Sequence, residues 1–215
     1  MKCRNHSLAF LTMCLLASAV FTGGCTTTGM DRSVKTSASM QEVDHEIRKM
    51  LVQIDATAAS LDAVVSPGQS KLKKSFDNYT DNLADLDKEG KKVIKRTEEL
   101  KANSKEYFAE WEKQGEAYTN PQIRELSEER RTKLAGLYAQ VPVASAGIKG
   151  TYLAYLTDLK EIQLYLSNDL TPKGIEAITP VAEKSVQDLD NLKASLRPVI
   201  SALDEINAEL YSEKN

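Results

Sequence analysis

LKKSFDNYTDNLADLDKEGKKVIKRTEELKANSKEYFAEWEKQGEAY, residues 72–118, is the stretch of sequence that decides the fold. Alternating steps of four and three residues visit positions that are mostly large and apolar or aromatic, and none of them is charged. These positions are Leu72, Phe76, Tyr79, Leu83, Leu86, Gly90, Val93, Thr97, Leu100, Ser104, Tyr107, Trp111, Gln114 and Tyr118. A seven-residue repeat of this kind is typical of a coiled-coil seam. At 1.5 Å per residue, one helix over this stretch would be about 70 Å long, which predicts a rod.

The rest of the chain shows the same helical periodicity and no pattern typical of strands. Alternating runs of β-branched residues and two-residue hairpin turns are absent. Turns with proline divide the helical pattern, at Ser66-Pro67-Gly68, at Asn120-Pro121 and at Asn168 to Pro172. We therefore predict an all-α fold, an elongated antiparallel bundle or coiled coil of four helices at about 39–65, 70–118, 122–168 and 172–212.

Antiparallel pairing around these turns indicates which residues lie at the same height along the rod. It places Pro142 level with Thr97 and with Pro198, and it places the start of the first helix near Arg96. Because three helices continue beyond that height, the sequence predicts a four-helix half and a three-helix half joined at a proline bend. Leu126 is expected in the core of the three-helix half. The bend is either a static accommodation or a hinge that moves when a partner binds.

The first residues indicate an export signal. Lys2 and Arg4 precede the uncharged segment SLAFLTMCLLASAVF. This segment is shorter than the about 20 apolar residues that a membrane-spanning helix needs. A basic start followed by a short apolar core predicts a signal peptide over residues 1–24.

The sequence FTGGC, residues 21–25, resembles the lipobox of bacterial lipoproteins, although Thr22 stands where leucine is preferred. The resemblance implies diacylglycerol and further acyl chains such as palmitate on Cys25, and hence a lipid-anchored cell-envelope protein. Since Thr26 rather than aspartate follows, it implies the outer membrane, facing the periplasm, if the source is Gram-negative. The alternative is an ordinary secretory signal that leaves Cys25 a free thiol. Residues 25–38, rich in Thr, Ser and Gly, are expected to form a flexible tether.

Composition excludes several classes of function. The chain has 28 Lys and Arg against 31 Asp and Glu, a net charge of -3. It therefore lacks the excess of positive charge that is typical of nucleic-acid-binding proteins. Once the signal peptide is removed, Cys25 and His45 are the remaining cysteine and histidine, so a disulfide framework, a Cys/His zinc site and a Cys–His dyad are excluded. Carboxylates have basic neighbours at helical spacing, which favours a solvated face over acid–base catalysis. We expect no enzyme activity, no cofactor and no metal.

Two groups of residues are candidates for docking a partner. The first is a basic stripe, which could bind an anionic partner or could belong to an ordinary mixed surface. The second lies at the last corner of the rod and is either a docking tip or simply a well-capped turn. The stripe consists of Lys88, Lys91, Lys92, Lys95 and Arg96, and the corner group consists of Asn168, Asp169 and Lys173.

A second class of function comes from small residues in the seam. Gly90, Thr97, Ser104 and Gly150 are expected to loosen the packing at mid-height, and a groove there would make the protein a ligand-binding module. Self-association through exposed seam residues of the three-helix half is a further possibility.

Three segments complete the sequence evidence: FAEWEKQ at 108–114, QIRELSEERR at 122–131 and YLTDLKEIQLYLSNDLTPKGI at 155–175. They resemble a bacterial family of helical, often lipid-anchored proteins known as a domain of unknown function. The resemblance implies an extended helical bundle and supplies no activity, cofactor or site residue. Our leading hypothesis is a non-enzymatic envelope protein that acts as a spacer, scaffold or adaptor for another envelope protein or the cell wall.

Overall fold

The computed structural model describes residues 28–66 and 71–211, and these form four helices without a strand. The helices are α1 (Gly29–Val65), α2 (Leu72–Gly115), α3 (Pro121–Asn168) and α4 (Pro172–Tyr211). The prediction of an all-α antiparallel bundle is confirmed, and the predicted bounds of the last three helices lie close to the observed ones. Cys25, the signal peptide and the lipobox lie outside the described residues.

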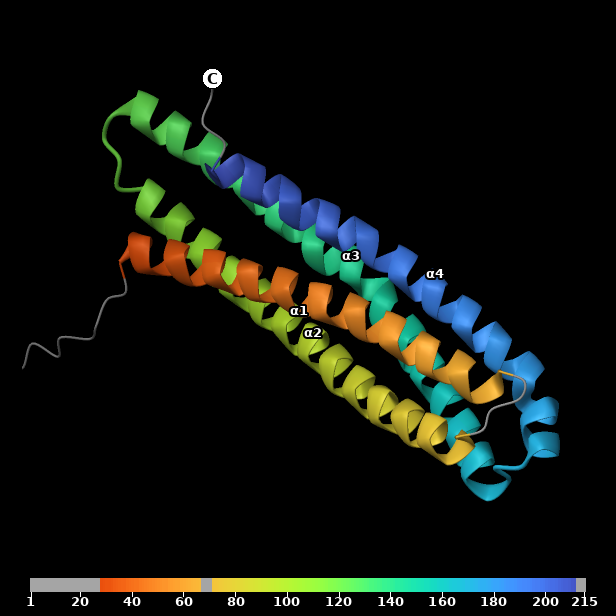
Figure 1. Ribbon diagram of the computed structural model, residues 1–215. Coiled ribbons are helices and arrows are strands. Elements are labelled where there is room, and N and C mark those ends of the chain that lie inside the picture. Colours follow the sequence, from red (N-terminus) through yellow and green to blue (C-terminus); the bar gives the residue numbers. More distant parts are fainter. Residues whose placement is uncertain (1–27, 67–70, 212–215) are drawn as a thin grey trace, which may run out of the picture.

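The helices run alternately up and down in a ring (Figure 1). Each helix packs against two neighbours, α1 on α2 and α4, and α3 on α2 and α4, whereas the helices of each diagonal pair lie apart over their described lengths. The start of α1 and the end of α4 lie at the same end of the rod as the α2–α3 connection, and we call this the Thr28 end. The α3–α4 corner lies at the opposite end, the Thr171 end. At 1.5 Å per residue, α3 alone is about 70 Å long.

The core follows the predicted seam along most of α2. The seam residues from Tyr79 to Ser104 are buried. Near the Thr28 end the buried face moves by one position, because Phe108 rather than Tyr107 enters the core. Phe108 meets Tyr138 of α3 with ring centroids 5.5 Å apart, a favourable edge-on aromatic contact.

Helix α1 begins at Gly29, so the expectation of a tether extending to residue 38 is wrong for residues 29–38. Thr28 and Asp31 form a capping box, in which the Thr28 hydroxyl accepts from the Asp31 N–H and the Asp31 carboxylate accepts from the Thr28 N–H. Side chains at the end of the predicted tether and just beyond it are used in packing. Ser39 is buried and accepts from the Asn103 side-chain amide at 2.6 Å, and Thr36 is buried beside it.

The longer α1 also removes most of the predicted three-helix half. Lys35 of α1 pairs with Glu106 of α2 at 3.7 Å, and a Cβ on Gly29 would lie 3.5 Å from Gln114 Oε1, so α1 reaches nearly to the end of α2. Leu126, expected in a three-helix core, is 65% exposed. Pro142 and Pro198 both lie inside continuous helices, and the bend at these prolines stays a prediction.

Two tyrosine side chains, Tyr152 and Tyr79, join α3 to α2 toward the Thr171 end. The Tyr152 ring fills the space beside Gly90, where an added Cβ would stand only 2.1 Å from Cζ of the tyrosine. Its hydroxyl donates to the main-chain oxygen of Asp87 at 3.2 Å. Further toward the Thr171 end, the buried Tyr79 hydroxyl donates to the Leu159 carbonyl at 2.7 Å. Glycine at position 90 is therefore required by packing.

None of the four helices, as far as the structure describes them, combines the length and the apolar character that crossing a membrane requires.

Candidate functional site

The basic stripe does not form a free cationic surface. Four of its five cations have carboxylate partners, and Lys92 and Arg96 reach partners on α1. Lys91 pairs with Asp87, Lys92 with Glu89 and Glu46, Lys95 with Glu99, and Arg96 with Glu42 and Glu99. Lys88 is exposed and has no ion-pair partner among the residues that the structure describes. Two of the five stripe residues, Lys92 and Arg96, thus join α2 to α1, whereas Lys91 and Lys95 pair within α2.

The ion pair of Lys92 with Glu89 stabilises the charged forms of both residues. The hydrogen bond from Lys92 to Glu89, 2.8 Å long, lowers the pKa of that carboxyl group against the opposing effect of burial. The same bond raises the pKa of Lys92. Glu46 and Glu89 have side chains only 14% and 12% exposed, and Lys49 lies within 3.5 Å of both. Because cations face these carboxylates, the cluster has the character of a structural network rather than of a general acid or base.

The corner residues at the Thr171 end serve mainly as a cap. The Thr171 hydroxyl accepts from the Gly174 N–H at 3.1 Å and donates to Asp169 Oδ1 at 2.6 Å. The Asn168 amide donates to the Leu164 carbonyl, within the last turn of α3. Lys173 is exposed and has no ion pair in the described part of the chain. Of the three predicted corner residues, Lys173 is thus the one available to a partner.

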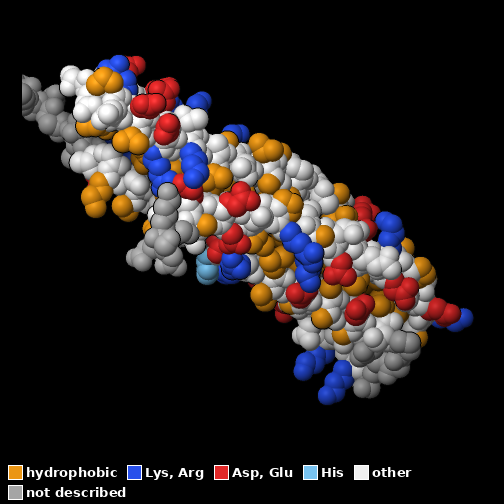
Figure 2. Space-filling view, turned by 90° about the horizontal axis from the view of Figure 1, so that it is seen from above, with side chains coloured by type: hydrophobic (Ala, Val, Ile, Leu, Met, Phe, Trp, Pro, Cys, Tyr) orange, Lys and Arg blue, Asp and Glu red, His pale blue; other side chains and the backbone are white. Residues whose placement is uncertain are grey.

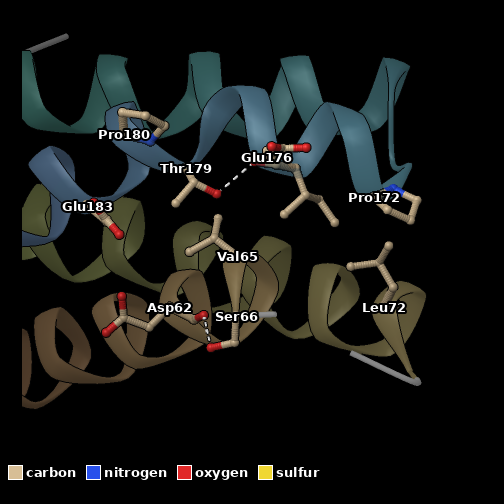
Figure 3. Close-up of a pocket in the computed structure, with 10 residues that line it drawn as sticks. Asp62, Val65, Ser66, Leu72, Pro172, Glu176, Thr179, Pro180 and Glu183 are labelled. Carbon is tan, nitrogen blue, oxygen red and sulfur yellow. Dashed lines mark hydrogen bonds between the residues drawn. The ribbon is translucent and has the colours of Figure 1, made fainter. Parts of the chain in front are cut away.

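A pocket of about 870 Å³ opens beside this corner, between the end of α1, the start of α2 and the first turns of α4 (Figure 3). Val65 and Leu72 face α4 across it, and Pro172 and Pro180 bound it on α4. Three carboxylates line it as well, those of Asp62, Glu176 and Glu183. Sequence reasoning missed this pocket, because it lies between the α1 and α2 ends and the first turns of α4, which are far apart in the sequence.

A second cavity lies at mid-height in the seam between α2 and α3, and we call it the seam cleft. It measures about 190 Å³. Val93 and Thr97 of α2 and Pro142 and Ile148 of α3 form its sides. Residues of the other two helices close its floor: Ile47 of α1, and Leu196 and Val199 of α4. The cleft brings Thr97 and Pro142 to one height with Val199, the neighbour of Pro198, in agreement with the predicted antiparallel pairing.

The predicted mid-height groove exists, but three of the four small residues do not line it. Thr97 lines the seam cleft, and Ser104 is buried about two helical turns away from Thr97. Gly90 is filled by the Tyr152 ring. Gly150 is exposed, and an added Cβ there would meet no atom within 4 Å. The cleft arises from Thr97 and Pro142, rather than from the two glycines.

Two sets of contacts hold the α2–α3 seam on either side of the cleft. On the Thr171 side, Asp87 accepts from Lys160 at 2.9 Å, next to the Tyr152 contact. On the Thr28 side, beyond the Phe108 contact with Tyr138, the Trp111 indole N–H donates to the Ser127 hydroxyl at 2.9 Å. Burial opposes ionisation of Asp87, but the hydrogen bonds from Lys160 and Lys91 outweigh it and lower the pKa of this carboxyl group.

The charged surface otherwise mixes both signs. On the face shown in Figure 2, acidic and basic side chains alternate along the rod with apolar side chains between them. His45 is exposed. Within residues 28–66 and 71–211, no three side chains of the His, Cys, Asp or Glu type come together as metal ligands would.

Comparison with known proteins finds a match to one protein family. A family model described as "Protein of unknown function (DUF2959)" matches residues 30–210. No curated protein and no solved structure matches the chain.

Replacing Asp87 tests whether its carboxylate fastens the seam. Asp87→Asn is expected to lower the free energy of unfolding by about 1–2 kcal/mol at pH 7, because Lys160 loses a charged partner. The pKa of Asp87 is lowered in the folded protein, so its contribution is complete above the ordinary value of 3.8 and is lost as the pH falls through the folded-state value. Urea unfolding at pH 7 and at pH 3 measures both effects.

The matched control is Asp85→Asn, since Asp85 is exposed on the same helix and has no ion pair in the described part of the chain. Its effect on the free energy of unfolding is expected to stay within about 0.5 kcal/mol. Equal effects of the two substitutions at pH 7 would show that Asp87 does not fasten the seam.

Proposed function

The chain belongs to the DUF2959 family of proteins of unknown function, and we propose that it is a non-enzymatic, lipid-anchored protein of the cell envelope. In this proposal the helical rod is an adaptor or spacer. Its lipid anchor lies at one end, and the opposite end contacts another envelope protein or the cell wall. In a Gram-negative cell the anchor would lie in the outer membrane, and the rod would extend into the periplasm.

The observation that carries the proposal is the position of the two ends. Cys25, the expected site of acylation, precedes Thr28 by three residues in the sequence, and Thr28 begins the described part of the rod. Lys173 and the large pocket lie at the Thr171 end. With a helix of about 70 Å between them, an anchor at one end keeps the other end well beyond the lipid headgroups.

The pocket at the Thr171 end supports a contact with a partner protein. Its floor is apolar, with Val65 and Leu72, and its carboxylates are those of Asp62, Glu176 and Glu183. This combination suits a segment that inserts an apolar side chain and carries Lys or Arg beside it. Asp62 and Glu176 have no cation partner among the described residues, so their charges are available to such a segment.

The arrangement of the carboxylates supports a non-enzymatic role. Asp87 and Glu89, with side chains 17% and 12% exposed, form ion pairs with lysines, and so does Glu46. A general acid at neutral pH needs a raised pKa, whereas the pKa values of Asp87 and Glu89 are lowered.

A second candidate function is the binding of a small apolar ligand, and the seam cleft favours it. The cleft is lined mainly by apolar side chains and draws on all four helices. Such a ligand could change how firmly α2 and α3 are held together.

The lipid anchor is tested by replacing the expected acceptor. Cells that express the full chain are grown with labelled palmitate, and the protein is expected to take up the label because the Cys25 thiol and the new amino group are acylated. Cys25→Ser is expected to abolish the labelling, since serine lacks the thiol. Cys14→Ser, within the signal peptide, is the control and should leave the labelling of the mature protein unchanged. Label retained by Cys25→Ser would contradict the proposal.

The adaptor role is tested by photo-crosslinking in intact cells. A benzophenone amino acid replaces Lys173 at the Thr171 end, and in a second strain it replaces the exposed Lys113 at the Thr28 end. We expect Lys173→benzoylphenylalanine to give a reproducible product with one envelope protein or with cell-wall fragments, because that end faces the partner. The Lys113 variant should not give that product. The same product from both positions, or none from Lys173, would contradict an adaptor that docks through the Thr171 end.

A further inference from the structure

The seam cleft is apolar inside and offers no free hydrogen-bond donor. Two hydroxyl groups line it, and both already donate to their own helix. The Thr97 hydroxyl donates to the Val93 carbonyl at 2.9 Å, and the Ser145 hydroxyl donates to the Val141 carbonyl at 2.7 Å. A polar group placed inside would lose its hydrogen bonds to water without replacement. The interior therefore suits a hydrocarbon.

The size of the cleft limits the length of that hydrocarbon. An apolar cavity of about 150 Å³ in another protein is known to bind benzene, so about 190 Å³ has room for roughly seven or eight carbon atoms. The walls from α2 and α3 and the floor from α1 and α4 belong to long helices, so this space exists without a rearrangement of the fold.

The rim of the cleft is cationic. Lys101 of α2 and Lys149 of α3 line it from opposite sides, both exposed. Neither lysine has an ion-pair partner within residues 28–66 and 71–211, in contrast to Lys91, Lys92 and Lys95 of the stripe. Glu98 is on the same rim and leaves a net charge of one positive unit. Two unpaired ammonium groups beside an apolar cleft complement a ligand with one anionic head.

We propose that the seam cleft binds a medium-chain fatty acid, with the hydrocarbon chain between α2 and α3 and the carboxylate between Lys101 and Lys149. The proposal rests on the second candidate function and names its ligand class. It is independent of the lipid anchor and of docking through the Thr171 end.

The test is titration of the full chain with octanoate at pH 7.5, followed by calorimetry and by NMR of the isoleucine and valine methyl groups. We expect saturable binding of one octanoate per chain, with the methyl shifts concentrated on Val93, Ile94 and Ile148. The double substitution of Lys101→Gln and Lys149→Gln is expected to weaken binding about tenfold or more, because both cationic partners are removed. Glu98→Gln is expected to strengthen binding, since it removes the carboxylate of the rim.

A matched pair of substitutions on α3 locates the site. Ala146 is exposed at the mouth of the cleft, and Ala139 is exposed on the same helix away from it. Ala146→Phe is expected to abolish octanoate binding, and Ala139→Phe to leave it unchanged. Methyl spectra of the ligand-free variants show whether each one folds, and the lysine and glutamate variants test the site without adding bulk.

The outcomes distinguish the fatty-acid proposal from the more general proposal that the cleft binds a small apolar ligand. Equal affinity for octanoate and 1-octanol would overturn the anionic ligand and keep an apolar cleft. Absence of binding by both compounds would overturn the fatty-acid proposal and the second candidate function together. Binding that persists in Ala146→Phe would show that octanoate binds elsewhere and would overturn the proposed site.

Discussion

The contact of Tyr152 with Gly90 is the constraint on which the arrangement of α2 and α3 depends. The Tyr152 ring occupies the space that a side chain at position 90 would fill, and Gly90 leaves this space open in the middle of a continuous seam. The cost of a glycine within a helix, about 1 kcal/mol relative to alanine, is offset by the burial of an aromatic ring. Asp87 and Lys160 add a charged contact at the same height.

The seam cleft follows from this contact and from the aromatic contact of Phe108 with Tyr138. Between these two points α2 presents Thr97, and α3 presents Pro142, which has no N–H for the Tyr138 carbonyl. Neither residue fills the seam as leucine would. On the other side of α2, ion pairs and the buried Ser39 and Thr36 hold α1 closely. The protein thus has one polar, closely held helix pair and one seam with a cavity.

Local patterns in the sequence were sufficient to predict the four helices, because a seven-residue repeat and proline-containing turns act over short distances. The capping box of Thr28 and Asp31 is equally local, but the Ser- and Thr-rich segment around it suggested a tether. Other features could not be predicted, since they join residues that are distant in the chain. The stripe was predicted from its spacing on α2, but two of its partners, Glu42 and Glu46, come from α1. Gly90 was predicted to loosen the packing, and the structure instead uses it to receive Tyr152.

A double-mutant cycle of Gly90 and Tyr152 tests this constraint most directly. The free energy of unfolding is measured by urea denaturation for the full chain, for Gly90→Ala, for Tyr152→Leu and for the double variant. Gly90→Ala is expected to cost about 1–3 kcal/mol in the presence of Tyr152, because the new methyl group overlaps the ring. In the Tyr152→Leu background the cost should vanish, since leucine does not extend to the ring atoms that would be overlapped. An equal cost of Gly90→Ala in both backgrounds would show that Tyr152 does not occupy the space beside Gly90 and would contradict the account.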